Sequence, residues 1–144
     1  MEQTKELIYG LNDRPPLRET IFAALQHLLA IFVAIITPPL IISSALQFDL
    51  ETTGFLVSMS LFVSGIATFI QCKRFGAVGT GLLCIQGTSF SFISPIIGAG
   101  MLGMVGGKMN IELGLSYIFG SCMVASVVEM LVSRVLPYMR KIIT

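Results

Sequence analysis

Few residues in this chain could do chemistry, and most of those few lie inside long apolar stretches. The only histidine, His27, follows Gln26 in a run without formal charge, and Glu129 interrupts the last apolar run. Ionisable side chains within membrane spans usually face the protein interior and carry function. His27 is therefore a candidate binding residue, or a packed residue that donates to a backbone carbonyl. Glu129 is a candidate proton site, or a structural carboxylate that bonds a neighbouring helix or Ser133, one turn on.

A third candidate site is the stretch from Gly79 to Pro95, where glycine, threonine and serine interrupt an apolar run. Residues 89–92, Ser-Phe-Ser-Phe, alternate with period two, which is typical of an extended strand. Ser94 before Pro95 is typical of a helix N-cap followed by the first helical position. We expect an extended piece at about 86–93 and a half-helix from about Pro95. Such backbone cannot face lipid, so it either lines a cavity, as in secondary transporters, or is a small-residue packing face.

The elements that position these residues are predicted to be membrane-spanning helices. Of the 144 residues, 54% are hydrophobic and 12% charged, about half the charged share of a soluble chain, and the mean hydropathy is +0.87. This composition excludes a soluble enzyme, a disordered tail and a nucleic-acid binder. Because about twenty apolar residues cross the hydrocarbon core, we predict an all-α membrane protein with four transmembrane spans and a broken third span. The predicted spans are 21–46, 54–71, 78–100 and 113–136.

The basic residues are distributed unevenly between the two sides of this four-span arrangement. Eight of the nine Lys and Arg residues fall in the N-terminal segment, the second connection and the C-terminal end, and only Lys108 falls on the other side. Basic residues concentrate in cytoplasmic loops, so both termini are expected in the cytoplasm. The predicted organisation is a cytoplasmic segment (1–19), a membrane domain (20–137) and a cytoplasmic connection (138–144).

Two further features of the sequence bear on local structure and cofactors. Thr37-Pro38-Pro39 is expected to kink the first span or break it locally, because proline lacks the N–H that a helix interior needs. The three cysteines form no C-x-x-C pair and no histidines cluster with them, which predicts neither a zinc site nor a disulfide scaffold. We expect no metal and no cofactor.

Three segments resemble the start of the nucleobase–ascorbate transporter family, the xanthine/uracil permeases. They are Asp-Arg-Pro-Pro-Leu at 13–17, Gln-His-Leu-Leu-Ala at 26–30 and Gln-Gly-Thr-Ser-Phe-Ser-Phe at 86–92. The segments 58–62 and 129–136 look most like bacterial xanthine permeases, and the resemblance extends from about Leu7 onward.

The resemblance implies a fold of fourteen spans in two inverted seven-span repeats, divided into core and gate domains. This chain would supply the first four spans, half of the core, with 138–144 leading to a missing fifth span. Carried over by position, His27 looks like the residue that supports the binding-site network, and Ala34 like the small residue packed near the base. Ser89 matches the position that tunes which base is accepted, and Phe90 matches the aromatic that approaches the base. The family's eighth-span glutamate and tenth-span Gln-Asn-x-Gly signature do not occur among these residues.

We therefore expect the N-terminal portion of a proton-coupled purine nucleobase permease of xanthine type in the bacterial inner membrane, not an enzyme, and not transport-competent alone. Its expected partners are a purine base, a proton, the lipid bilayer and the missing C-terminal spans. Two alternatives stay open. One is a complete four-span drug/proton antiporter that forms a homodimer and uses Glu129; the other is a non-transporting membrane remnant or assembly partner.

Overall fold

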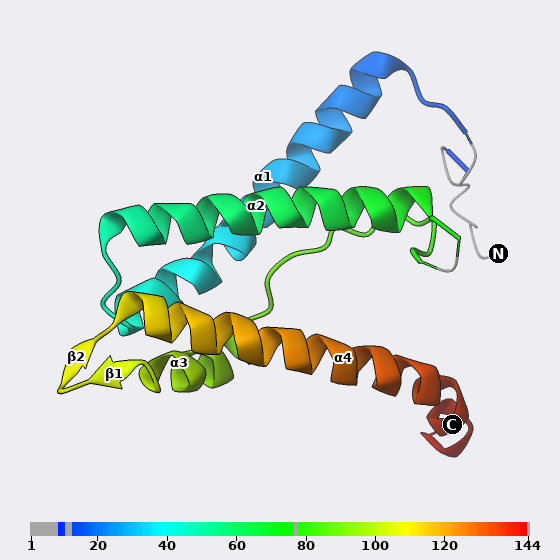
Figure 1. Ribbon diagram of the computed structural model, residues 1–144. Coiled ribbons are helices and arrows are strands. Elements are labelled where there is room, and N and C mark those ends of the chain that lie inside the picture. Colours follow the sequence, from blue (N-terminus) through cyan, green and yellow to red (C-terminus); the bar gives the residue numbers. More distant parts are fainter. Residues whose placement is uncertain (1–8, 11–12, 77, 144) are drawn as a thin grey trace. The chain divides into compact units, whose positions relative to one another are not determined.

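The chain is built from helices, with one small hairpin between the last two. The computed structural model describes residues 9–10, 13–76 and 78–143, the last seven of these by their backbone alone. Figure 1 shows the order of the elements along the chain. They are α1 (Leu17–Ala45), α2 (Leu50–Lys73), a short 3₁₀ helix η1 (Phe90–Phe92), α3 (Ile93–Met101), β1 (Met104–Val105), β2 (Lys108–Met109) and α4 (Ile111–Ile143).

Three helices in the described part of the chain are long and apolar enough to cross a membrane. They are Leu17–Ala45, Leu50–Lys73 and Ile111–Leu136, and a shorter apolar helix covers Phe90–Met101. These helices lie where the charge-poor runs predicted the first, second and fourth spans. The all-helical character of the prediction is therefore confirmed.

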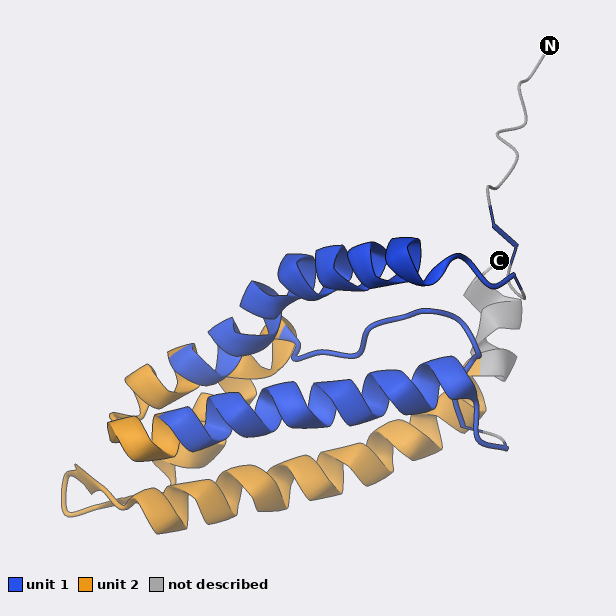
Figure 2. Ribbon diagram, turned by 90° about the horizontal axis from the view of Figure 1, so that it is seen from above, with its two compact units in different colours: residues 1–40, 54–89 blue, residues 41–53, 90–144 orange. Residues whose placement is uncertain are grey.

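Two compact units make up the chain, and Figure 2 colours them separately. The first unit comprises residues 1–40 and 54–89, and the second comprises 41–53 and 90–144. The boundary between the units therefore crosses α1, since Leu40 belongs to the first unit and Ile41 to the second. Each unit is described by itself below.

Helix α1 continues through the proline pair that was predicted to kink or break it. Pro38 and Pro39 both lie inside the helix, so the break predicted from the sequence is absent, although two helical hydrogen bonds must be lost there. Close to the N-terminal end of the helix, the Tyr9 hydroxyl donates to Glu19 Oε2 at 2.5 Å. This hydrogen bond and the neighbouring negative charge raise the pKa of Tyr9 above its ordinary value.

Helix α2 has a carboxylate cap at its start and a tight turn at its end. The Asp49 carboxylate accepts from the Thr52 hydroxyl at 2.5 Å and from the Thr52 backbone N–H at 3.3 Å. These bonds favour the ionised form and lower the pKa of Asp49. After the helix, Arg74 adopts a positive φ of 50°. Phe75 and Val78 then exchange two backbone hydrogen bonds, which reverses the chain.

The second unit has a small core between the end of α1, α3 and α4. Ile42, Leu46 and Ile118 are buried there. Gly100 and Gly103 allow close approach: a Cβ on Gly100 would lie 2.4 Å from a methyl carbon of Leu46, and one on Gly103 would lie 2.4 Å from the backbone nitrogen of Gly114. The chain just after α3 thus lies in close backbone contact with the first turn of α4, and Gly100 leaves room for Leu46.

The start of α3 differs from its prediction. The helix begins at Ile93, with Phe92 as its N-cap and no side-chain cap, and η1 occupies part of the stretch predicted to be extended. The assignment of Ser94 as N-cap and Pro95 as first helical residue is therefore wrong. Pro95 is tolerated as the third helical residue because the first four N–H groups of a helix have no helical acceptor.

Candidate functional site

The candidate site is built around residues 79–89, a segment of the first unit that is neither helix nor strand. It follows the turn at the end of α2 and leads to η1 (Figure 1). Backbone of this kind needs hydrogen-bond partners from other elements if it lies at membrane depth. The structure shows several of these partners, on both helices of the first unit.

Polar side chains of α2 bind the segment at two places. At Gln86, the Ser64 hydroxyl donates to the backbone carbonyl, and the backbone N–H donates to Thr68 Oγ1 at 2.9 Å. Ser64 and Thr68 are four residues apart, which places them on the same face of the helix. The N–H and C=O of Gln86 are thus satisfied by hydroxyl groups in the absence of a β-sheet.

The second place lies at the end of α2, where helical carbonyls lack partners within the helix. Here the Gln71 side-chain amide donates to Thr80 Oγ1 at 2.8 Å, and the Gly81 N–H donates to the Gln71 carbonyl at 3.0 Å. Gly79 fits against the same turn, because a Cβ there would lie 2.5 Å from the Ile70 carbonyl oxygen. The segment is therefore fixed to α2 near both of its ends.

Helix α1 contacts the segment at the proline pair. Pro38 and Pro39 cannot donate to the carbonyls four residues earlier, those of Ala34 and Ile35. The Thr88 hydroxyl lies 3.1 Å from the Ala34 oxygen and 3.0 Å from the Ile35 oxygen. Both freed carbonyls therefore have a donor, which the segment supplies.

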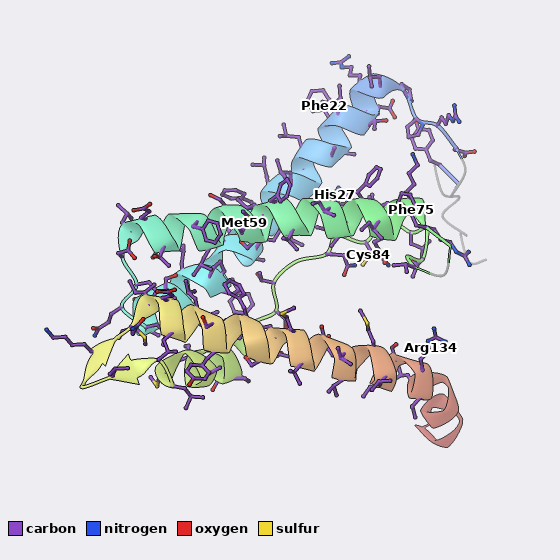
Figure 3. The ribbon with its side chains drawn as sticks, in the orientation of Figure 1. Phe22, His27, Met59, Phe75, Cys84 and Arg134 are labelled. Atoms are coloured by element: carbon purple, nitrogen blue, oxygen red, sulfur yellow. The ribbon has the colours of Figure 1, made fainter. Side chains whose placement is uncertain are left out.

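The predicted site residues of the first unit lie around this contact. Ala34 is half-buried and contributes its carbonyl to Thr88, and Ser89 follows Thr88 and is exposed. His27 lies seven residues before Ala34, on about the same face of α1 and roughly 10 Å away along the axis. Figure 3 labels His27 on α1 and Cys84 on the segment.

The ring of His27 has a defined hydrogen bond within its own helix. Its Nδ1 lies 2.8 Å from the Ala23 carbonyl oxygen. A carbonyl only accepts, so Nδ1 carries the proton and, in the neutral ring, Nε2 remains an acceptor. This hydrogen bond agrees with the interpretation of His27 as a donor to a backbone carbonyl, but the side chain is exposed in this chain and is not a packed residue here.

The remaining two candidate residues belong to the second unit. Phe90 begins η1, and 53% of its surface is exposed. Glu129 is exposed on α4 and has no hydrogen bond or ion pair to any other residue that the structure describes. The predicted pairing of Glu129 with Ser133 is wrong, because the Ser133 hydroxyl donates to the Met130 carbonyl at 2.7 Å.

The cysteines and acidic side chains of the described part of the chain are dispersed. No group of three or more His, Cys, Asp or Glu side chains is placed to hold a metal ion there. Cys72, Cys84 and Cys122 are free thiols. The polar chemistry of the candidate site therefore comes from hydroxyls, amides and backbone groups, together with His27.

Sequence reasoning missed four residues that build the site: Ser64, Thr68, Gln71 and Thr88. The spacing of Ser64 and Thr68 was a usable signal, since two hydroxyls on one face of an apolar helix can serve backbone outside that helix. The proline pair was a second signal, because it frees two carbonyls whose donor has to come from elsewhere.

Comparison with known proteins identifies relatives of this chain. The family model Xan_ur_permease, described as the Permease family, matches residues 18–144. The chain is 53% identical to the xanthine permease XanP of Escherichia coli (strain K12) over 142 residues, 99% of this chain and 30% of that protein. It is 44% identical to the xanthine permease XanQ of the same organism over 139 residues, 96% of this chain and 30% of that protein.

A more distant relative is the uric acid-xanthine permease of Emericella nidulans, 40% identical over 97 residues, which are 63% of this chain and 17% of that protein. No solved structure matches the chain. The chain belongs to the nucleobase–ascorbate permease family. It spans about 30% of the length of the bacterial relatives XanP and XanQ.

Proposed function

We propose that this chain is the N-terminal portion of a proton-coupled permease for a purine nucleobase of xanthine type. The observation that carries the proposal is the non-helical segment before Ser89, fixed by hydroxyl groups to two apolar helices. Non-helical backbone at membrane depth occurs where it is buried in protein or lines a cavity, and transporters use such segments at their substrate sites. The relatives named as xanthine permeases supply the substrate class.

In this proposal the chain crosses the membrane four times, with both termini in the cytoplasm. Helices α1, α2 and α4 are three of the spans, and the segment 79–89 with η1 and α3 forms the broken third span. The concentration of basic residues in the cytoplasmic segments supports this orientation. The site segment is bonded to the apolar helices α1 and α2, so in this proposal it lies within the membrane.

The proposed site residues have distinct roles. Ser89 selects the base through its hydroxyl, and Phe90 offers an aromatic face on which a planar ring can stack. His27 presents Nε2 to the polar network, and Ala34 leaves room beside the ring. A purine needs several matched donors and acceptors once it is desolvated. The remaining ones, including a proton-linked carboxylate, are proposed to come from spans beyond this chain, so this chain alone does not transport.

The same comparisons weigh against the alternative of a four-span drug/proton antiporter. The proteins that match nearly the whole chain are named as xanthine permeases. Glu129, the carboxylate on which that alternative depends, is exposed in this chain.

The experiment is a chimera in which this chain replaces the 142-residue match in E. coli XanP. It is produced in cells without xanthine permeases, and uptake of radiolabelled xanthine is measured. We expect saturable uptake that a protonophore abolishes, and no uptake by this chain alone. A second XanP chimera, which carries the matching N-terminal segment of XanQ, is the control for the effect of the junction itself on transport. If that control transports and the present chimera reaches the membrane in equal amount without transporting, the proposed function is wrong; uptake by this chain alone would contradict the need for further spans.

A further inference from the structure

The proline pair of α1 and the hydroxyl of Thr88 are joined through two carbonyls, although Thr88 lies 49 positions after Pro39 in the sequence. An α-helix bonds each carbonyl to the N–H four residues on, and Pro38 and Pro39 remove that donor from the carbonyls of Ala34 and Ile35. The Thr88 hydroxyl approaches both oxygens at nearly equal distances, 3.1 and 3.0 Å. Equal distances to two acceptors describe a shared, three-centre hydrogen bond.

The surroundings of this bond are largely apolar on the α1 side, and the bond itself is partly buried. Ile35, Pro38 and Pro39 are buried, and Thr88 is half-buried. Gly87 allows the close approach, because a Cβ at that position would lie only 3.2 Å from Cγ1 of Ile35. Partial burial limits how well water can replace a lost donor, so the loss of the Thr88 hydroxyl would leave the two carbonyls poorly satisfied.

We propose that Thr88 is a positioning residue: its hydroxyl joins the proline-freed carbonyls of α1 to the segment and thereby fixes the adjacent Ser89. The two α2 hydroxyls hold Gln86, three residues before Ser89. Thr88 adds an attachment to α1 one residue before Ser89, next to Ala34. This inference rests on the proposed function, in which Ser89 contacts the base. The two α1 carbonyls that lack helical donors are therefore the place where the substrate-binding segment attaches to α1.

The bond itself is tested in the 144-residue chain by a double-mutant cycle on the melting temperature in detergent. Thr88→Val keeps the shape and removes the hydroxyl, and it is expected to lower the melting temperature by several degrees. Thr88→Ser is expected to restore most of the loss. When Pro38 and Pro39 are both replaced by alanine, helical N–H groups satisfy the two carbonyls, so Thr88→Val is expected to cost little. An equal loss in both backgrounds would overturn the proposed bond.

Thr37→Val is the matched control, since Thr37 lies on the same turn of α1 as the proline pair. Its hydroxyl donates to the Val33 carbonyl at 2.6 Å, but that carbonyl keeps its helical donor, the Thr37 N–H. Removal of this hydroxyl is therefore expected to have little effect in either background. A loss equal to that of Thr88→Val would show that any hydroxyl on this turn matters, and would contradict the specific role of Thr88.

The positioning role is tested in the transporting XanP chimera. Thr88→Val is expected to raise the xanthine concentration for half-maximal uptake about three- to tenfold, the effect of one net hydrogen bond, at an unchanged amount of protein in the membrane. Thr88→Ser is expected to restore the parent value. If only the maximal uptake rate of Thr88→Val falls, and it falls in proportion to the amount of protein in the membrane, Thr88 has a purely structural role. That result would overturn the positioning role. Failure of the parent chimera would instead contradict the proposed function and leave the melting cycle as the decisive test of the bond.

Discussion

Gly79 and Gly81 offer a sharp test of how the site segment is attached to α2. Both have positive φ values, 87° and 76°, so alanine at either position bears the cost of a left-handed backbone, about 1–2 kcal/mol. Only Gly79 is also sterically confined. Its added Cβ would lie 2.5 Å from the Ile70 oxygen, 3.0 Å from the Gln71 oxygen and 3.1 Å from Cα of Arg74, whereas Gly81 has open space.

The structure gives the size of the expected difference. Ordinary contact begins at 3.4 Å, so the segment must move by roughly 0.9 Å away from the Ile70 carbonyl to admit a methyl group. Strain of this kind in packed structure costs about 1–3 kcal/mol. We expect Gly79→Ala to lower the free energy of unfolding by about 2–5 kcal/mol, and Gly81→Ala by about 1–2 kcal/mol.

The assay is the melting temperature of the chain as a fluorescent-protein fusion, followed by size-exclusion chromatography after heating. At about 2–4 °C for each kcal/mol, Gly79→Ala should melt several degrees below Gly81→Ala. Equal melting temperatures would refute the reasoning, because they would show that the segment does not lie against the end of α2. A loss at Gly81 as large as the one predicted for Gly79 would contradict it as well.

Three further predictions concern the second unit, each checked by the same melting assay. Gly103→Ala should be strongly destabilising, because its Cβ would lie 2.4 Å from the Gly114 nitrogen; a melting temperature within 1 °C of the parent would contradict that close approach. The hydrogen bonds from Thr52 lower the pKa of Asp49 in the folded protein. The ionised carboxylate therefore stabilises the fold above about pH 3.9, the pKa of an unperturbed Asp. This stabilisation is lost as the pH falls through the lowered pKa of the folded protein. Asp49→Asn should therefore lose less stability than the parent between pH 6 and 3, and parallel losses would contradict this. The Ser43 hydroxyl is buried without a hydrogen-bond partner among the described residues, so Ser43→Ala should melt at the same temperature or higher; a clear fall would indicate an unrecognised acceptor.

Charge patterning predicted the long helices well because the cost of a charge in hydrocarbon acts on every residue of a span. The limits of α1, Leu17–Ala45, lie within four residues of the predicted 21–46. The start of α3 was predicted less well, since Ser94-Pro95 fits a helix start in isolation, whereas Phe92 already adopts helical dihedral angles, with φ −92° and ψ −4°.

The hydroxyl contacts of the site were not predictable residue by residue. Serine and threonine in apolar helices mostly bond a carbonyl of their own helix, as Ser60 does with Val57 and Ser126 with Met123. Ser64 and Thr68 look the same in the sequence but serve Gln86 instead. A hydroxyl bonds a group outside its own helix only where backbone from another segment without hydrogen-bond partners lies close to it. The position of that segment is set by the tertiary fold. The same local preference explains why Ser133 bonds Met130 and not Glu129.

The central claim, that the segment ending at Ser89 forms part of a purine site, is tested most directly by substrate protection of a thiol. In the XanP chimera with all other cysteines replaced, Ser89→Cys is labelled with a maleimide in the presence and absence of xanthine. A second version retains only the native Cys84, an exposed thiol of the same segment, as the control. If Ser89 lies beside the bound base, xanthine slows labelling at position 89 and leaves Cys84 unaffected. Equal labelling at position 89 with and without saturating xanthine, in a chimera that still transports, would show that this segment does not form part of a purine site.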